Sequence, residues 1–234
     1  MNKITALVPM KGHSERVPNK NLKLFSSSPL YHKIVKTLVK CKYIDEIIVN
    51  TDSKMIIDDI KTNFKNITIK KRKKELQGDF VSMNKIIESD ILNHKSEIFI
   101  QTHSTNPLLN SNTIDKALKM FTEEKKNSFK NFDSMFSVTE LQSRFYCSHF
   151  QPINHNINEL IRTQDLEPIF EENSCFYIFT KDSFFNNKKR RIGKKPHLYK
   201  LNKFESIDID NFEDFFLAEQ IYKLKKNKIE LQKK

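Results

Sequence analysis

The fold is decided by the stretch Ile4-Thr5-Ala6-Leu7-Val8-Pro9-Met10-Lys11-Gly12-His13-Ser14-Glu15-Arg16-Val17-Pro18-Asn19-Lys20-Asn21. Its mostly apolar beginning, Ile4–Val8, is typical of a short buried strand. The loop that follows holds a glycine, a serine, two prolines and three cations. Three cations on a short loop at the end of a strand suit the binding of a polyphosphate. The loop is neither a Walker P-loop nor a dinucleotide fingerprint, because both glycine patterns are absent.

Beyond this stretch, apolar segments that predict strands alternate with segments of helical periodicity. Strands are expected at Ile4–Val8, Glu46–Asn50, Ile67–Ile69, Glu97–Gln101, Asp133–Val138 and Cys175–Thr180. Helices are expected at Pro29–Lys40, Lys54–Asn63, Ser82–Leu92, Ser111–Glu123 and Phe212–Leu231. The polar triplet Thr51-Asp52-Ser53 supplies an N-cap for the second helix. This alternation predicts an α/β fold, a three-layer doubly wound and mostly parallel sheet that binds ligands at the carboxyl ends of its strands.

The length of 234 residues fits one domain, 1–234, with a core of its own. One segment interrupts the rhythm of strands and helices. Residues Leu141–Asn173 are rich in Gln, Asn, His and Pro and show little periodicity. We interpret them as an insertion that either covers the site or reaches a second subunit.

The net charge of +12 has two interpretations, a phosphate-bearing partner or lysines on a solvated surface. The second is favoured because lysine is spread along the chain. A nucleic-acid-binding module is the rival class of function, but no RRM, KH or zinc signature is present. The spacing of Cys41, Cys147 and Cys175 suggests reduced thiols in a cytoplasmic protein. We expect no signal peptide, and no apolar run approaches the roughly 18 residues that would span a membrane.

Two carboxylates stand in the segment Ser206-Ile207-Asp208-Ile209-Asp210. The segment is interpreted as an apolar strand on which Asp208 and Asp210 alternate, so both carboxylates point the same way, and such a pair suits Mg²⁺ bound to substrate phosphates. The alternatives are an exposed strand edge, or Asp210 as the N-cap of the next helix with Glu213 completing a capping box.

Two further segments carry side chains that suit a polar ligand. The stretch Gln101–Leu109 is dense in hydrogen-bonding groups of the kind that recognise hydroxyl-rich molecules, although it is also an ordinary composition for a polar loop. In the second segment, Leu160–Leu166, Arg162 could form a fork onto a substrate carboxylate. The alternative for Arg162 is a surface ion pair with Asp165 or Glu167.

Together these segments resemble the acylneuraminate cytidylyltransferase (CMP-sialic acid synthetase) family. The family patterns are P-A-R-x-G-S-K-R-I/V-P-x-K-N, Q-x-T-S-P-L, R-x-Q-D-L-P…N-G-x-x-Y-I/V and S-I/L-D-I-D-x-x-E-D. The matching segments, in the same order, are Pro9–Asn21, Gln101–Leu108, Arg162–Ile178 and Ser206–Asp214. A fifth pattern, R-P-x-x-L-A-x-D-x-x-S, resembles the spacing of Arg72, Leu76, Asp79 and Ser82. The resemblance runs from Ile4 to Ala218, nearly the whole chain.

The resemblance implies a Rossmann-like nucleotidyltransferase fold, a dimer whose insertion crosses to the partner, and a transfer of CMP from CTP to a nine-carbon keto sugar acid. It implies no nucleic-acid or membrane partner, and a role in surface-glycan assembly. The nucleotide would be bound by Met10, Lys11, Gly12, Ser14, Arg16, Lys20, Asn21, Arg72 and Ser82, with Lys11, Arg16, Lys20 and Asp210 in catalysis. The acid would be bound by Gln101, Thr102, His103, Ser104, Arg144, Arg162, Gln164 and Tyr177, and Mg²⁺ by Asp208 and Asp210.

The chain departs from the family patterns at several positions. Lys11 stands where the family usually has Arg, Ser174 replaces the Gly of the N-G pair, and Glu171 stands where a cation is common. The segment that is D-T-A-S-S in the family is Asp79–Met83 here. These changes leave the acceptor open among sialic, legionaminic, pseudaminic and octulosonic acids or a smaller acid such as a phosphonate.

Overall fold

A twisted sheet forms the middle of the protein. The computed structural model describes residues 3–126 and 131–231. Its main sheet has seven strands in the order β5-β4-β1-β6-β8-β7-β9. The strands are β1 (Ile4–Met10), β4 (Glu46–Thr51), β5 (Ile67–Lys71), β6 (Ile98–Thr102), β7 (Ser134–Leu141), β8 (Ile169–Thr180) and β9 (Pro196–Leu201). Only β8 runs antiparallel to its neighbours, so the sheet is mostly parallel.

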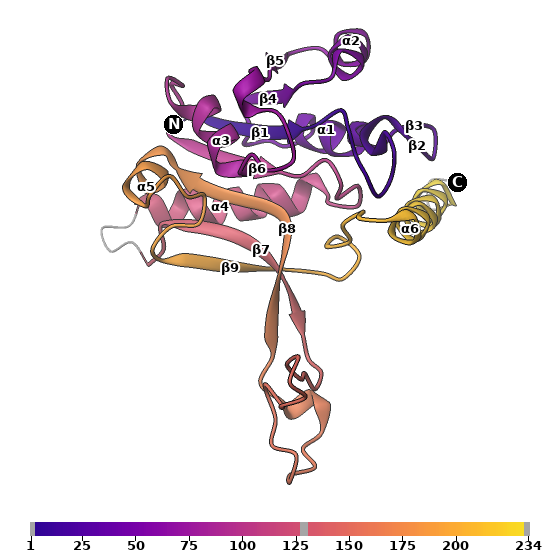
Figure 1. Ribbon diagram of the computed structural model, residues 1–234, viewed down its shortest axis with the longest axis vertical. Helices are drawn as coiled ribbons and strands as arrows, with labels where there is room; N and C mark the ends of the chain where they lie inside the picture. The colour runs from indigo at the N-terminus through magenta and orange to yellow at the C-terminus, as the bar shows by residue number, and fades with distance from the viewer. Residues whose placement is uncertain (1–2, 127–130, 232–234) are drawn as a thin grey trace.

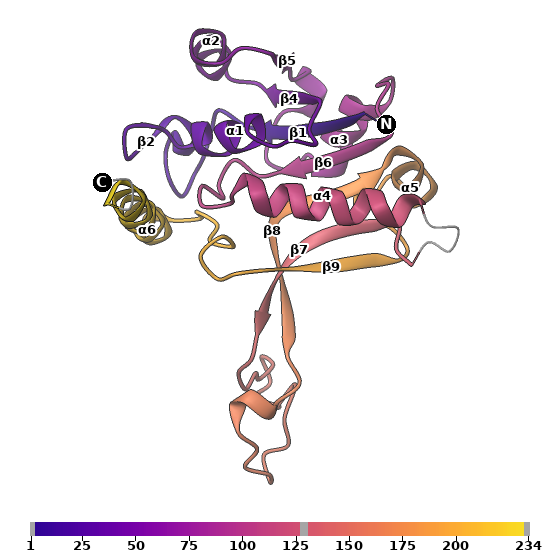
Figure 2. The same cartoon turned by 180° about the vertical axis from the view of Figure 1, so that it is seen from behind.

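Helices cover both faces of this sheet (Figures 1 and 2). One face packs against α1 (Tyr31–Val39), α2 (Lys54–Asn63) and α4 (Ser111–Lys126). The other face packs against α3 (Met83–Ile91) and α5 (Lys181–Asn186). The last helix, α6 (Phe212–Leu231), packs beside the short hairpin of β2 (Leu24–Phe25) and β3 (Ser28–Pro29). The predicted three-layer doubly wound α/β fold is confirmed.

Strand β1 shows why the fold forms around the opening stretch. All seven of its residues are buried, because helices cover the sheet on both sides. Ala6 and Val8 pack in the core under α1 and α4, whereas Leu7 packs in the core under α3 and α5. Successive side chains of a strand point to opposite faces, so a central strand buried on both sides is apolar throughout.

Most predicted elements are found within a few residues of their expected bounds, and α6 and α2 match them. The predicted cap of α2 is also confirmed, since the Ser53 side chain accepts from the backbone N–H of Ile56. The prediction missed α5, β9, the β2–β3 hairpin and three 3₁₀ helices, at Lys20–Leu22, Lys74–Leu76 and Thr163–Asp165. Strand β9 is hard to recognise because it lies at the edge of the sheet and five of its six residues are exposed or half-buried.

The strand predicted for Ser206–Asp210 is wrong. These residues follow β9 as an extended segment outside any strand, fixed by the hydrogen bond from Ile209 N to Thr105 O at 3.0 Å. The alternation of residues that suggested a strand arises because Ile209 is buried against Phe25 and Phe215. Asp210 is not the helix cap either. Asn211 caps α6 instead, because its side chain accepts from Asp214 N at 2.9 Å while Asp214 accepts from Asn211 N at 3.0 Å.

The predicted insertion is an arm that projects from the body of the molecule (Figure 1). The outer halves of β7 and β8 form its stalk, and residues 142–168 form its end. No residue of 141–173 is among the described residues that line the cleft at the carboxyl end of β1. The expectation that the insertion covers the site is therefore wrong within one subunit, and the contact with a second subunit stays a prediction.

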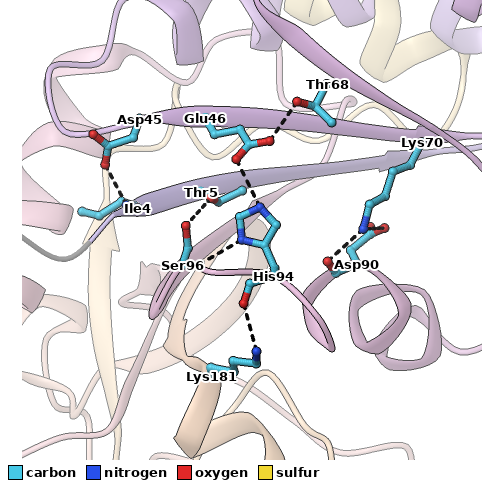
Figure 3. Close-up of polar contacts among 10 residues, drawn as sticks. All are labelled: Ile4, Thr5, Asp45, Glu46, Thr68, Lys70, Asp90, His94, Ser96 and Lys181. Atoms are coloured by element: carbon cyan, nitrogen blue, oxygen red, sulfur yellow. Dashed lines mark hydrogen bonds and ion pairs between the residues drawn. The ribbon is translucent and has the colours of Figure 1, made fainter.

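A network of polar groups closes the sheet at the amino ends of its strands (Figure 3). His94 lies at its centre. Its Nδ1 accepts from Ser96 N at 3.1 Å, so its Nε2 carries the hydrogen and donates to Glu46 Oε2, also at 3.1 Å. Glu46 also accepts from Thr68 Oγ1 at 2.8 Å, and Ser96 bonds to Thr5 at 2.8 Å. The network ties the loop before β6 to β1, β4 and β5.

Candidate active site

A cleft of about 350 Å³ opens at the carboxyl end of β1. Three loops line it: the loop after β1, the loop before α3 and the loop after β6. Strand β1 lies between β4 and β6, the point at which the chain crosses from one side of the sheet to the other. Doubly wound sheets bind their ligands at this switch point. Of the described helices, none has the length and apolar character needed to cross a membrane.

The loop after β1 is held in a defined shape. Val17 is fully buried and anchors its middle, and Asn19 adopts a left-handed conformation with φ of 53°. Gly12 allows the loop to approach the start of α2 closely, since a Cβ at this position would lie 2.8 Å from the Cβ of Ser53. The backbone N–H of Gly12 donates to Asp52 Oδ1 at 2.7 Å. The three cations of the loop are therefore presented from a fixed backbone.

Each of the three loop cations contacts an oxygen that a phosphate could replace. Lys11 forms an ion pair with Asp79 across the cleft. Arg16 Nη2 lies 2.7 Å from Asp210 Oδ1, and Lys20 donates to the carbonyl of Ile209. Burial lowers the pKa of Lys20, an effect that the nearby carboxylates of Asp208 and Asp210 oppose. These cations line one wall of the cleft, and two of them, Arg16 and Lys20, lie next to the carboxylate pair of Asp208 and Asp210.

The carboxylate pair fits a hard cation. Asp208 Oδ1 is buried without a hydrogen-bond partner among the described residues. Burial raises the pKa of Asp208, and the negative charge of Asp210 raises it further. Among the described residues there is no cluster of three or more His, Cys, Asp or Glu that could hold a metal ion alone. A pair of carboxylates completed by substrate phosphate oxygens is nevertheless the usual way in which proteins bind Mg²⁺.

Two of the predicted nucleotide-binding residues are engaged within the protein. The Asn21 amide donates to Lys11 O at 2.9 Å and accepts from Ser104 Oγ at 2.7 Å, so it ties the loop to the end of β6. Arg72 lines the cleft but donates to the side chain and carbonyl of Asn50 and to Met10 O. Asn50 in turn donates to the buried carboxylate of Asp90 at 2.9 Å. Asn21, Ser104 and Arg72 therefore line the cleft with side chains whose hydrogen bonds hold the surrounding loops and strands in place.

The structure brings most of the remaining predicted nucleotide residues to the cleft. Met10 and Ser14 line it. Ser82 stands at the N-cap position of α3, without a hydrogen bond from its side chain to the helix, and is exposed between the lining residues Val81 and Met83. Thr102, which is predicted to bind the acid, is buried and is not among the described residues that line the cleft, and its Oγ1 has no partner among the described residues.

His103 forms the inner wall of the cleft. Its Nε2 is buried with no partner among the described residues. Burial, together with the nearby charge of Arg191, lowers the pKa of His103 to about 4. The imidazole is therefore neutral at pH 7, and it can donate or accept one hydrogen bond but cannot supply a charge.

Gln101 and Tyr177 lie side by side as partners across the β6–β8 pair. Sequence reasoning missed their third neighbour, Arg191, which stacks on the Tyr177 ring with its Cζ 3.5 Å from the ring centroid. No spacing pattern could have found Arg191, because it sits in the basic run Lys188–Lys195 and reaches the site only through the fold.

The structure does not bring Arg144, Arg162 and Gln164 to the cleft of their own subunit, since all three lie in the arm. Arg144 donates to the carbonyl of Ile161, and the carbonyl of Gln164 accepts from Gln142 at 2.8 Å. Arg162 forms an ion pair with Asp165 at 2.7 Å, so the alternative given for it above is confirmed.

The chain is similar in sequence to known cytidylyltransferases. The model of a protein family described as cytidylyltransferase matches residues 5–234. A pseudaminic acid cytidylyltransferase of Campylobacter jejuni is 25% identical over 233 residues, covering 93% of this chain and 95% of its own. An N-acylneuraminate cytidylyltransferase of Oncorhynchus mykiss is 28% identical over 233 residues and 93% of this chain, which spans only 50% of that relative's length.

A solved structure has a similar fold. It is a CMP:2-keto-3-deoxy-manno-octonic acid synthetase complexed with CTP, with a TM-score of 0.66 at 10% sequence identity. The match covers 95% of this chain and 99% of that one.

Proposed function

The chain belongs to the cytidylyltransferase family, and on that premise we propose that it transfers CMP from CTP to the anomeric hydroxyl of a sialic-acid-like nonulosonic acid, releasing pyrophosphate. The observation that carries this proposal is the cleft itself. Lys11, Arg16 and Lys20 line it at the switch point of the sheet, and Arg16 and Lys20 lie next to the carboxylates of Asp208 and Asp210. A cationic loop beside a carboxylate pair suits a nucleoside triphosphate.

The reaction is an in-line displacement at the α-phosphorus of CTP. The bond from the acid's anomeric oxygen to that phosphorus forms as the bond to the pyrophosphate oxygen breaks, and the hydroxyl proton passes to water. Lys11, Arg16 and Lys20 bind the triphosphate and stabilise the charge that develops on the departing pyrophosphate. The neutral His103 excludes water from the inner wall of the cleft without adding charge there.

Asp208 and Asp210 would hold Mg²⁺ together with phosphate oxygens. The bound ion would neutralise the triphosphate and polarise the reacting groups. Replacing Asp210 with Ala should abolish turnover and leave the fold intact, as measured by pyrophosphate release and circular dichroism. Activity that persists in this variant at saturating Mg²⁺ would remove Asp210 from the metal site.

The acceptor follows from the relatives. Those matched in sequence are named for N-acylneuraminate, pseudaminic acid and N,N'-diacetyllegionaminic acid, which are all nonulosonic acids. The alternatives are an octulosonic acid, for which the solved synthetase is named, and a phosphonate. The CMP-acid product would then serve as an activated donor for surface-glycan assembly.

The first experiment measures pyrophosphate release from CTP and Mg²⁺ with each acid in turn. The panel holds neuraminic, legionaminic, pseudaminic and octulosonic acids and two alkylphosphonates. Release with a nonulosonic acid supports the proposal and names the substrate. Release with only an octulosonic acid or a phosphonate supports the alternative, and a protein that does not bind CTP by calorimetry contradicts the whole assignment.

We also propose a homodimer whose arms contact the partner subunit. Apolar side chains are exposed along the arm, among them Phe150, Ile157 and Leu160, at 87%, 68% and 97% exposure. Burying them against a second copy would stabilise the dimer. Sedimentation of the wild-type protein and of Leu160→Lys tests this, and a wild-type protein that sediments as a monomer would contradict it.

Nucleic-acid binding is the second candidate, favoured only by the charge of +12. The dependence on salt distinguishes nucleic-acid binding from cytidylyl transfer, because non-specific nucleic-acid binding falls steeply with ionic strength whereas turnover of CTP with Mg²⁺ should persist.

The thiols of Cys41, Cys147 and Cys175 are all free, which supports a cytoplasmic location.

A further inference from the structure

Arg191 lies beside the inner wall of the cleft, outside every segment that the family patterns cover. It comes from the loop between α5 and β9, and its guanidinium stacks on the face of Tyr177 at 3.5 Å from the ring centroid. Its Nη1 donates to Gln101 Oε1 at 2.5 Å. Two contacts from two different strands therefore fix the plane of the guanidinium, and stacking of this kind is a common way to orient an arginine.

The contact with Arg191 also fixes the orientation of Gln101. A guanidinium only donates hydrogen bonds, so the oxygen of the Gln101 amide must face it and the nitrogen must point elsewhere. That nitrogen, Nε2, is buried and has no partner among the described residues, and Gln101 as a whole is 0% exposed. A buried amide N–H without an acceptor is costly and rare in native proteins, so it needs a specific explanation, and a bound ligand would supply the acceptor.

The charge of Arg191 is not balanced by an ion pair. Within residues 3–126 and 131–231, the contacts of its guanidinium are those with Gln101 and Tyr177. The negative charge of Glu172 raises the pKa of Arg191, but the two side chains form no ion pair among the described residues. The Glu172 carboxylate instead accepts a hydrogen bond from the Tyr177 hydroxyl. Burial lowers the pKa of Arg191, yet a guanidinium keeps its proton in proteins. A half-buried cation with unused donors thus lies near His103, which lines the cleft.

The position relative to the reacting groups identifies the ligand. Arg191 lies close enough to His103 to help lower its pKa, and His103 lines the cleft that would hold the triphosphate. In a keto sugar acid the carboxylate is attached to the same carbon as the attacking hydroxyl, so the group that binds it must lie beside the triphosphate. Arg162, the other arginine considered for this role, is paired with Asp165 in the arm.

We propose that Arg191, with the amide nitrogen of Gln101, binds the carboxylate of the acceptor acid and so places the anomeric hydroxyl for attack. A carboxylate accepts hydrogen bonds only, and these two groups offer donors only. The inference rests on the proposed function, and it deepens that function by naming the group that selects for an acid.

The test compares Arg191→Met with Arg190→Met, its exposed neighbour on the same loop. For the acid that the wild-type enzyme turns over, KM should rise by about 10- to 100-fold in Arg191→Met, as expected for the loss of a charged hydrogen-bonded pair. The KM for CTP should stay within twofold, and Arg190→Met should match the wild type. Arg191→Lys, which keeps the charge without the fork, should fall between and serves if the Met variant does not fold.

A second substrate makes the test specific for the carboxylate. The amide of the same acid keeps its shape but lacks the charge, so the wild-type enzyme should prefer the acid strongly and Arg191→Met should lose most of that preference. A variant that keeps the preference, or raises both KM values equally, would overturn the assignment while the wild-type turnover still upheld the proposed function. A wild-type enzyme that turns over no acid would overturn both.

Discussion

The two ends of the central strands differ in how completely the protein satisfies its own polar groups. At the amino end, His94, Glu46, Ser96 and Thr5 are bonded to one another (Figure 3). At the carboxyl end, buried atoms lack partners among the described residues: Gln101 Nε2, Thr102 Oγ1, His103 Nε2, Asn106 Oδ1 and Asp208 Oδ1. Buried polar atoms are normally paired. The polar groups at the amino end therefore satisfy one another, whereas those at the carboxyl end leave donors and acceptors that a ligand could pair with.

This difference predicts opposite consequences for substitutions at the two ends. Changes at the amino end should lower stability and leave turnover per folded molecule unchanged. Changes at the carboxyl end should lower turnover and cost little stability. The predictions below test this separation, beginning with the largest expected effect.

Lys20→Met should lower kcat/KM by about 100- to 1000-fold, because it removes a cation directed at the developing charge of the pyrophosphate. The urea midpoint should change little, since among the described residues the Lys20 ammonium donates to one carbonyl, that of Ile209. Pyrophosphate release and urea denaturation measure the two quantities. Lys23→Met is the matched control, because Lys23 is exposed next to the same loop and contacts Phe212 and Phe215 instead. An equal loss of activity in both variants would contradict the role of Lys20.

His103 should make the protein less stable in acid. Its pKa is about 4 in the folded protein against an ordinary 6.5, so the unfolded chain binds the proton first as the pH falls. The free energy of unfolding should therefore be unaffected above pH 6.5 and lose about 3 kcal/mol as the pH falls to about 4. Urea titrations of the wild type and His103→Asn over this range measure it. Equal slopes in the two proteins would show that the pKa of His103 is the same in the folded and unfolded states.

His94→Ala should lower the free energy of unfolding by about 1 to 3 kcal/mol, because it leaves the Ser96 N–H buried without an acceptor. The KM for CTP and kcat of the folded enzyme should not change. Urea denaturation and pyrophosphate release check these statements. A change in KM with no loss of stability would reverse the proposed division between the two ends.

Thr68→Val should have the smallest effect, a loss of about 0.5 kcal/mol or less. Thr68 is exposed and contributes one hydrogen bond to Glu46, and Val suits a strand as well as Thr does. The same urea measurement applies. A loss as large as that of His94→Ala would show that burial does not set the strength of this network.

The sequence predicted the scaffold better than the site. The strands and helices around β1 were predictable because their periodicity reflects burial on two faces. The segment around Asp208 and Asp210 was misread as a strand, since Ile209 alternates with them for a different reason, its packing against Phe25 and Phe215. The cation loop was found from its composition, but the internal bonds of Asn21 and Arg72 were not, because side-chain partners far apart in the chain leave no local pattern.

By itself, then, the sequence determined the α/β class, the order of the strands and helices, and the cationic loop that meets the carboxylate pair. These depend on local periodicity and on the rule that parallel strands end at one edge of a sheet. Only the tertiary structure decided that Arg162 lies in an arm, paired with Asp165, and that Arg191 stacks on Tyr177 beside the cleft. The physical reason is that a long side chain takes its role from the surface it is packed against, and the fold alone brings that surface to it.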